Sequence, residues 1–123
     1  MRMNRTFRFM PPKLNAALQA ALNGADIDHA VDRWGYVYYH DRDTEAFEDI
    51  LATVRSSVFE SWQVLSCPAD AVNAYRQVMR QRKVRFVVEV DNNRVEFLIP
   101  GDIDPHSWPL DAHPFDHITF VHH

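Results

Sequence analysis

The sequence has little cysteine or glycine and no long hydrophobic run. A single cysteine, Cys67, excludes a disulfide framework within the chain and a zinc site built from cysteines. Three glycines are too few for the Gly-rich loops that nucleotide enzymes wrap around phosphates. No stretch of about 18 apolar residues is present, so we expect no membrane-spanning helix. These absences leave a soluble protein for which we expect no cofactor.

Length and composition are those of an ordinary globular domain. The chain has 123 residues, of which 46% are hydrophobic, enough for one domain with its own core. Arg2, Arg5 and Arg8 interrupt the first apolar residues, so the N-terminus lacks the pattern of a secretory signal. We therefore expect a cytoplasmic protein that forms a single domain over residues 1–123, with residues 100–123 as an irregular tail wrapped around it.

Apolar spacing and turn residues predict the order of the elements. Strands are expected over 6–10, 34–40, 62–65, 84–90 and 95–99, with a last short strand near 118–120. Helices are expected over 12–22, from 43–44 to 58, and from 68 onward, the first ending at Asn23-Gly24 and the second capped by Asp43 or Thr44. The predicted fold class is α+β, with three helices on a mixed sheet in the order β-α-β-α-β-α-β-β. Helices on one face and helices on both faces remain open alternatives.

The hairpin is the clearest local pattern. Asparagine tolerates positive φ, so Asn92-Asn93 predicts a two-residue turn between the alternating apolar residues of 84–90 and 95–99. That register places Glu89 opposite Glu96, and like charges directly opposite each other destabilise a sheet. Such a pair can serve as an acid/base couple. We favour two plainer explanations, a slipped register or neutralisation by Arg85 and Arg94.

Charge is distributed unevenly along the chain. Residues 26–49 hold eight acids and two arginines, a local net charge of −6, and aromatic side chains lie within the same stretch. Exposed rings beside carboxylates suit an interface with a basic protein. The alternative is that the rings belong to the core and the acids to a solvated loop and helix start. The predicted partner-binding residues are Asp41, Asp43, Glu45, Glu48 and Asp49 for charge, with Trp34, Tyr36 and Tyr38 as anchors.

A basic stretch follows later, at residues 76–85, where five cations lie within ten residues. Three of them fall at the predicted end of the third helix, where the helix dipole favours cations in any case. The formal net charge of the whole chain is −4, and no nucleic-acid-binding motif is present. We therefore expect no nucleic-acid partner.

The last 24 residues contain five of the seven histidines and four aspartates, but neither lysine nor arginine. Imidazole and carboxylate are ligands for zinc, iron or manganese, so His113, Asp116 and His117 form a candidate metal site. The alternative is a solvated loop. Cys67 precedes the third helix, where the dipole favours its thiolate, although a half-buried structural cysteine fits equally well.

Two functional hypotheses result. The first is a non-catalytic protein that binds a basic protein through its acidic and aromatic residues, for example an inhibitor or immunity protein that blocks a toxin or nuclease. The second is a small enzyme or metal-binding protein that uses His113, Asp116 and His117, with Cys67 or Glu89 as acid or base. We favour the first and expect no enzymatic activity. The sequence leaves monomer and homodimer both open.

Overall fold

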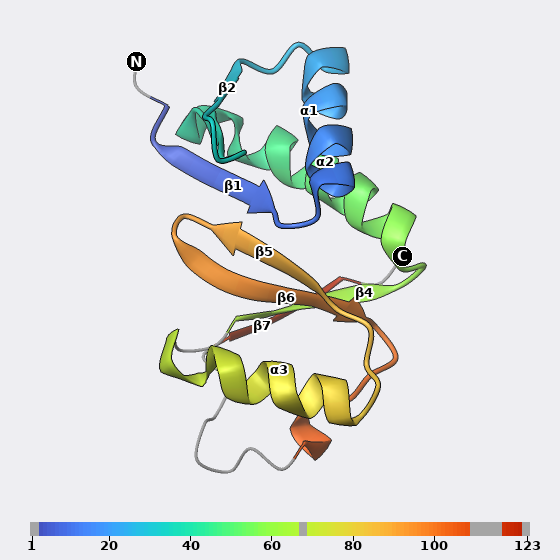
Figure 1. Cartoon of the computed structure of the whole chain (residues 1–123). Coiled ribbons are helices and arrows are strands. Elements are labelled where there is room, and N and C mark those ends of the chain that lie inside the picture. Colours follow the sequence, from blue (N-terminus) through green and yellow to red (C-terminus); the bar gives the residue numbers. More distant parts are fainter. Residues whose placement is uncertain (1–2, 67–68, 109–116, 122–123) are drawn as a thin grey trace.

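Within the described residues, seven strands form one antiparallel sheet that carries three α-helices (Figure 1). The computed structural model describes residues 3–66, 69–108 and 117–121, with the side chains of 106 and 117–121 excepted. The elements are β1 (Arg5–Phe9), α1 (Pro12–Gly24), β2 (His29–Val31), β3 (Val37–Tyr39), α2 (Thr44–Val58), β4 (Trp62–Ser66), α3 (Val72–Gln81), β5 (Val87–Asp91), β6 (Arg94–Pro100) and β7 (His117–Val121). Three short 3-10 turns are η1 (Asp41–Asp43), η2 (Ala69–Ala71) and η3 (Pro105–Ser107).

The strand order is β2-β3-β1-β5-β6-β4-β7, and each recorded strand pair is antiparallel. The α+β class predicted from the sequence is confirmed, whereas the mixed sheet is wrong. The single strand predicted over 34–40 is also wrong. Residues 32–36 form a loop, and β2 and β3 flank it as a hairpin. With three residues, β2 is too short to show the alternation by which strands are recognised.

The same β-α-β-β connectivity occurs twice. In the first unit (β1, α1, β2, β3), the third strand pairs with both the second and the first. In the second unit (β4, α3, β5, β6), the third strand again pairs with the second and the first. The ladder between β1 and β5 joins the two units into one sheet. The helix α2 follows the first unit, and β7 extends the second at β4.

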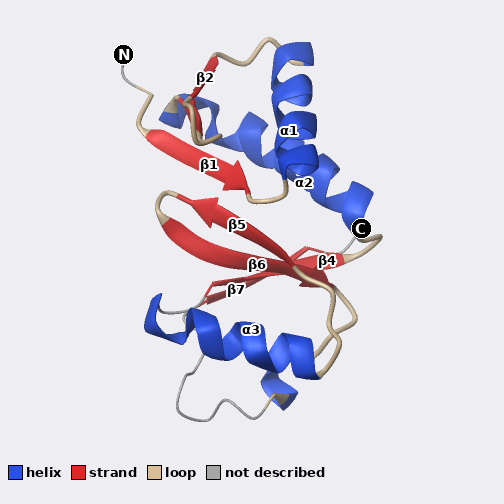
Figure 2. Cartoon of the chain, in the orientation of Figure 1, coloured by secondary structure: helices blue, strands red, loops and turns tan. Residues whose placement is uncertain are grey.

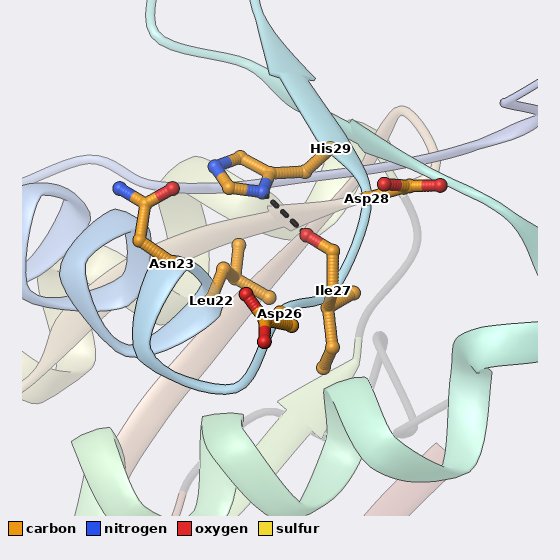
Figure 3. Close-up of a pocket in the computed structure, with 6 residues that line it drawn as sticks. All are labelled: Leu22, Asn23, Asp26, Ile27, Asp28 and His29. Carbon is orange, nitrogen blue, oxygen red and sulfur yellow. Dashed lines mark hydrogen bonds between the residues drawn. The ribbon is translucent and has the colours of Figure 1, made fainter.

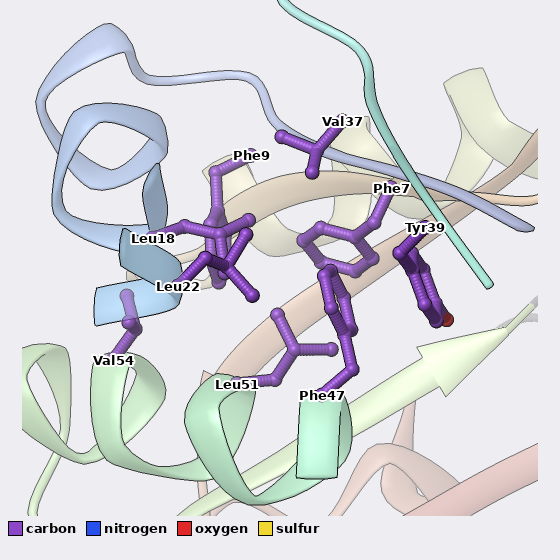
Figure 4. Packing of buried hydrophobic residues seen from close by; sticks show 9 residues of the cluster. All are labelled: Phe7, Phe9, Leu18, Leu22, Val37, Tyr39, Phe47, Leu51 and Val54. Atoms are coloured by element: carbon purple, nitrogen blue, oxygen red, sulfur yellow. The ribbon is translucent and has the colours of Figure 1, made fainter. Parts of the chain in front are cut away.

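Helices cover both faces of the sheet, which resolves the alternative left open by the sequence (Figure 2). The helices α1 and α2 pack on β1 and β3, where Tyr39 and Phe47 stack with ring centres 3.7 Å apart (Figure 4). The helix α3 packs on the opposite face with Tyr75, Phe97 and Ile99. Among the described residues, this second cluster includes no side chain of β1, β2 or β3. The helix α3 therefore does not cover the first unit.

The helices α1 and α3 are each followed by a residue in the left-handed backbone conformation. Asp26 has φ +54°, and the Ile27 N–H donates to the Leu22 carbonyl (3.1 Å). At the end of α3, Lys83 has φ +57°, and the Val84 N–H donates to the Met79 carbonyl (2.8 Å). The apolar residue after each turn packs back on a core cluster. The helix end predicted at Asn23-Gly24 is confirmed, since α1 ends at Gly24, but the left-handed residue is Asp26 rather than either of these two.

Two predicted helix starts also differ from the structure. Asp43 is the N-cap residue of α2, but no side chain there makes a capping hydrogen bond, and the Thr44 hydroxyl donates to the Asp41 carbonyl instead (2.6 Å). The helix expected from Pro68 begins at Val72, after η2. Cys67 and Pro68 lie outside the described residues. The apolar stripes of both helices are otherwise as predicted, with Phe47, Leu51, Tyr75 and Met79 buried.

The hairpin is confirmed in register. Val90 pairs with Val95 and Glu89 with Glu96, and Asn92 and Asn93 both have positive φ, +49° and +68°. A slipped register is thus the wrong explanation for the facing carboxylates. The Asn92 side chain also ties the turn to β1, because its Oδ1 accepts the Thr6 N–H (2.8 Å).

Candidate functional site

The carboxylates predicted to bind a partner gather at η1 and the first two turns of α2. Asp41, Glu45, Glu48 and Asp49 are exposed, and Asp43 is partly exposed. We call these five residues the acidic surface. Because neither Asp41 nor Asp43 makes a side-chain capping hydrogen bond, their carboxylates remain available to solvent or to nearby cations. A helix start favours negative side chains electrostatically, so the charge is stable there without a partner.

Three arginines of the chain approach the acidic surface. Arg5 lies 3.9 Å from Asp41, Arg42 lies 3.9 Å from Asp43, and Arg55 lies 4.0 Å from Glu48. These separations are at the limit of an ion pair, and the pairs of Arg5 and Arg42, which are open to solvent, contribute little to stability. Glu45 and Asp49 make no ion pair with any described residue. The chain therefore neutralises its acidic surface incompletely.

A pocket of about 390 Å³ borders this region where α1 ends and β2 begins (Figure 3). Its lining includes Asp26, Asp28 and His29, and the His29 Nδ1 lies 2.8 Å from the Ile27 carbonyl oxygen. Arg42 links the pocket to the acidic surface, because it lies 4.0 Å from Asp28 as well as near Asp43. The pocket thus adds negative charge and the carbonyl end of a helix beside the five carboxylates.

The predicted aromatic anchors lie elsewhere, on and beside loop 32–36. The register of β1 with β3 puts Tyr38 next to Thr6, on the face opposite to the one where Tyr39 packs under α2. Tyr36 and Tyr38 are partly exposed, and Trp34 is 58% exposed. The structure therefore does not bring the three rings together with the acidic surface, which lies at the α2 side and at the other end of β3.

The rings are accompanied by arginines instead. The Arg33 guanidinium lies 4.3 Å from the centre of the Trp34 ring, and that of Arg8 lies 5.5 Å from the Tyr36 ring. Sequence reasoning missed this pairing because it grouped the rings with the acids by proximity along the chain. The alternation of strand residues was the signal that separates Tyr38 from Tyr39.

Loop 32–36 is held by Asp32. Its Oδ1 accepts the N–H groups of Trp34 (2.9 Å) and Tyr36 (3.0 Å), and its Oδ2 accepts the Tyr38 hydroxyl (3.0 Å). Desolvation raises the pKa of Asp32, but these hydrogen bonds outweigh it and lower the pKa below its ordinary value. The loop therefore presents Trp34 from a fixed backbone.

The facing carboxylates on the hairpin are part of a buried ion cluster. Glu89 is fully buried, and Arg55 of α2 donates to both of its oxygens, from Nε (3.0 Å) and from a terminal nitrogen (2.6 Å). The guanidinium also lies 5.0 Å from the ring of Trp62. Arg85 and Arg94 were the wrong cations to expect, because the neutralising charge comes from the inner face of α2. Arg55 comes four residues after Leu51, on the buried face of α2, and this spacing was the available signal.

Glu96 has no arginine bonded to it. Burial, together with the nearby carboxylates of Asp91 and Glu89, raises its pKa to about 8. Glu89 itself is enclosed on all sides and clamped by Arg55, so its geometry is that of a structural ion pair rather than of an acid or base in contact with substrate. The role of Glu89 in the second hypothesis thus receives no support from its position.

The remaining predicted residues are not brought into a site by the described structure. His113 and Asp116 lie outside the described residues, as does Cys67, and His117 is the first residue of β7, where its backbone pairs with Ser66. In the part of the chain that is described, no group of three or more histidine, cysteine, aspartate or glutamate side chains is arranged to hold a metal. The predicted tail site stays a prediction.

Over residues 3–66, 69–108 and 117–121, no helix combines the length and apolarity needed to span a membrane. No family model, curated protein or solved structure matches this chain.

Proposed function

We propose that this protein is a non-catalytic binding protein whose acidic surface docks a basic protein. The observation that carries the proposal is a set of exposed carboxylates on η1 and α2, two of which have no ion-pair partner among the described residues. Carboxylates held on a helix keep a fixed spacing, so a complementary set of lysines or arginines can pair with several of them at once.

The finer form of the proposal is an inhibitor or immunity protein. A basic toxin or nuclease carries cations where it binds phosphate, and an array of carboxylates on a small protein can occupy that site and exclude nucleic acid. Electrostatic steering accelerates such an association and makes it sensitive to salt. Inhibition would be steric, with no chemistry performed by this chain.

The test compares the wild type with two triple variants of equal net charge. In the first, Asp41→Lys, Glu45→Lys and Asp49→Lys reverse the acidic surface. In the control, Glu60→Lys, Asp70→Lys and Asp102→Lys change the net charge equally at exposed positions elsewhere. Each protein and the wild type are immobilised, and binding of an arginine- and lysine-rich peptide and of a basic ribonuclease is measured at low and physiological salt.

The wild type and the control are expected to bind both probes in a salt-sensitive way. The acidic-surface variant is expected to bind them with an affinity at least about tenfold lower, a loss of 1.4 kcal/mol. Equal binding by the two charge-matched variants would show that net charge alone attracts the probes, and the proposal would fail. Inhibition of the ribonuclease by the wild type and the control is the outcome that the finer form requires.

A further inference from the structure

A second surface feature lies at the end of β1, where α1 begins. It is a groove of about 280 Å³ whose walls include Met10, Pro12, Arg33 and Trp34. Among the described residues three large hydrophobic side chains are exposed, and two of them, Met10 (39%) and Trp34 (58%), line this groove. Clustered exposed apolar side chains mark interaction sites more often than isolated ones do.

Both walls are fixed by one buried side chain. Asn15, which is 6% exposed, accepts the Phe9 N–H at Oδ1 (3.1 Å) and donates from Nδ2 to the Gly35 carbonyl (2.7 Å). Gly35 has φ +89°, and a Cβ there would lie 3.3 Å from Asn15 Nδ2, so the close approach requires glycine. A groove that is already ordered binds without the entropic cost of ordering its walls.

The rim of the groove is cationic. Arg8 and Arg33 both line it, and neither makes an ion pair with a described residue; each guanidinium lies over an aromatic ring instead. The acidic surface is distant, because Arg5 meets Asp41 at the opposite end of β1. At about 3.3 Å per residue, that strand separates the two by roughly 13 Å.

We propose that this groove binds a short acidic segment of a partner protein. Carboxylates of the segment would pair with Arg8 and Arg33, and an apolar side chain between them would pack on Trp34 and Met10. Arginine suits this role because its planar donors match a carboxylate in pairs. The inference goes beyond the proposed function, since it assigns a second site of opposite charge that can be occupied while the acidic surface holds another protein.

Single-stranded nucleic acid fits the groove less well. Stacking of bases requires free ring faces along a row of cations. Here the Arg33 guanidinium already lies over Trp34, and the groove offers two cations. Tyr38 is partly exposed, but its hydroxyl is already bonded to the Asp32 carboxylate.

The experiment selects ligands rather than assuming one. A random peptide library is selected on the wild-type protein, and the enriched peptides, carrying a fluorescent label, are titrated against four proteins while the anisotropy of the label is followed. These are the wild type, Arg8→Glu/Arg33→Glu, Trp34→Ala, and the control Arg80→Glu, an exposed arginine on α3. In the three proteins that keep Trp34, intrinsic tryptophan fluorescence gives a second readout that reports mainly on this residue, because Trp62 and Trp108 are buried. Single-stranded oligothymidylate is titrated in parallel.

The expected result is enrichment of peptides in which acidic residues flank an apolar one, with affinity reduced at least about tenfold by the double charge reversal and by Trp34→Ala, and less than about twofold by Arg80→Glu. Failure to enrich peptides, enrichment of basic ones, or equal binding by Arg8→Glu/Arg33→Glu would overturn the proposal. Tighter binding of oligothymidylate than of any selected peptide would also overturn it. None of these outcomes bears on the proposed role of the acidic surface, which the lysine variants above test separately.

Discussion

Arg55 and Glu89 form the most enclosed ion pair in the described part of the chain. Both are buried, and the contact is a two-point hydrogen bond between α2 and β5. Removal of one partner leaves an uncompensated charge, so Arg55→Met is expected to lower the free energy of unfolding at pH 7 by about 3–5 kcal/mol. Urea unfolding measures the change.

The double variant Arg55→Met/Glu89→Leu provides the control for that prediction. It removes both charges, and replacing a buried pair by apolar side chains is often close to neutral. We expect it to recover most of the stability lost by Arg55→Met alone. A double variant no more stable than the single one would show that packing, rather than the orphaned carboxylate, sets the loss.

Glu96 is expected to make the free energy of unfolding depend on pH in the direction opposite to that of an ion-paired carboxyl group. Its pKa is raised from the ordinary 4.5 to about 8, so between these pH values the unfolded chain ionises while the folded chain holds a proton. Its contribution to stability is therefore full below about pH 4.5 and is lost as the pH rises to about 8. Glu96→Gln removes this penalty.

The difference in unfolding free energy between Glu96→Gln and the wild type is thus expected to grow with pH. The variant should be more stable by at least about 1 kcal/mol at pH 8.5, since one pKa unit corresponds to 1.36 kcal/mol, and the advantage should vanish near pH 4. Urea unfolding at a series of pH values measures it. A difference that does not change with pH would mean that Glu96 ionises normally in the folded protein.

At the scale of elements, the two asparagines of the turn between β5 and β6 have different roles, one in backbone conformation alone and one also in a side-chain hydrogen bond. Asn93 has φ +68° and its side chain makes no hydrogen bond to another described residue, so Asn93→Gly is expected to raise stability by up to about 1 kcal/mol. Asn92 also has positive φ, but its Oδ1 accepts the Thr6 N–H, and Asn92→Gly loses that link to β1.

We therefore expect Asn92→Gly to be less stable than Asn93→Gly by about 0.5–1.5 kcal/mol, the net value of one hydrogen bond. Thermal unfolding of the two variants side by side measures the difference. Equal stabilities would indicate that backbone conformation alone matters at this turn and that the bond to Thr6 adds nothing.

The elements that could be predicted are those specified by local chemistry. The hairpin register follows from strict alternation and two asparagines, and the stripes of α2 and α3 follow from helical spacing. The end of α1 at Gly24 could also be predicted, but the left-handed residue Asp26 could not, because its position depends on where Ile27 reaches the core. The candidate sites were predicted by residue type but not by grouping: the exposed acids were identified, whereas Trp34 was assigned to them although it lies beside Arg33.

At the scale of the whole molecule, the repeated β-α-β-β connectivity was not visible in the sequence, because the two units share topology rather than residues. The units are joined by the ladder between β1 and β5 and by the bond from Arg55 of α2 to Glu89. Both junctions are in or beside buried side chains, so opening one unit exposes the core of the other. This arrangement predicts that the two units unfold together.

Native-state hydrogen exchange tests that cooperativity. The slowest amides of β1 and β3 and those of β4 and β6 are expected to report the same free energy of opening, within about 0.5 kcal/mol. Arg55→Met should then lower both values by the same amount, although Arg55 lies on the helix that follows the first unit and Glu89 in the second. Unequal values in the wild type, or a loss confined to one unit in the variant, would mean that each β-α-β-β unit opens on its own and that the sheet is two cooperative bodies sharing a ladder.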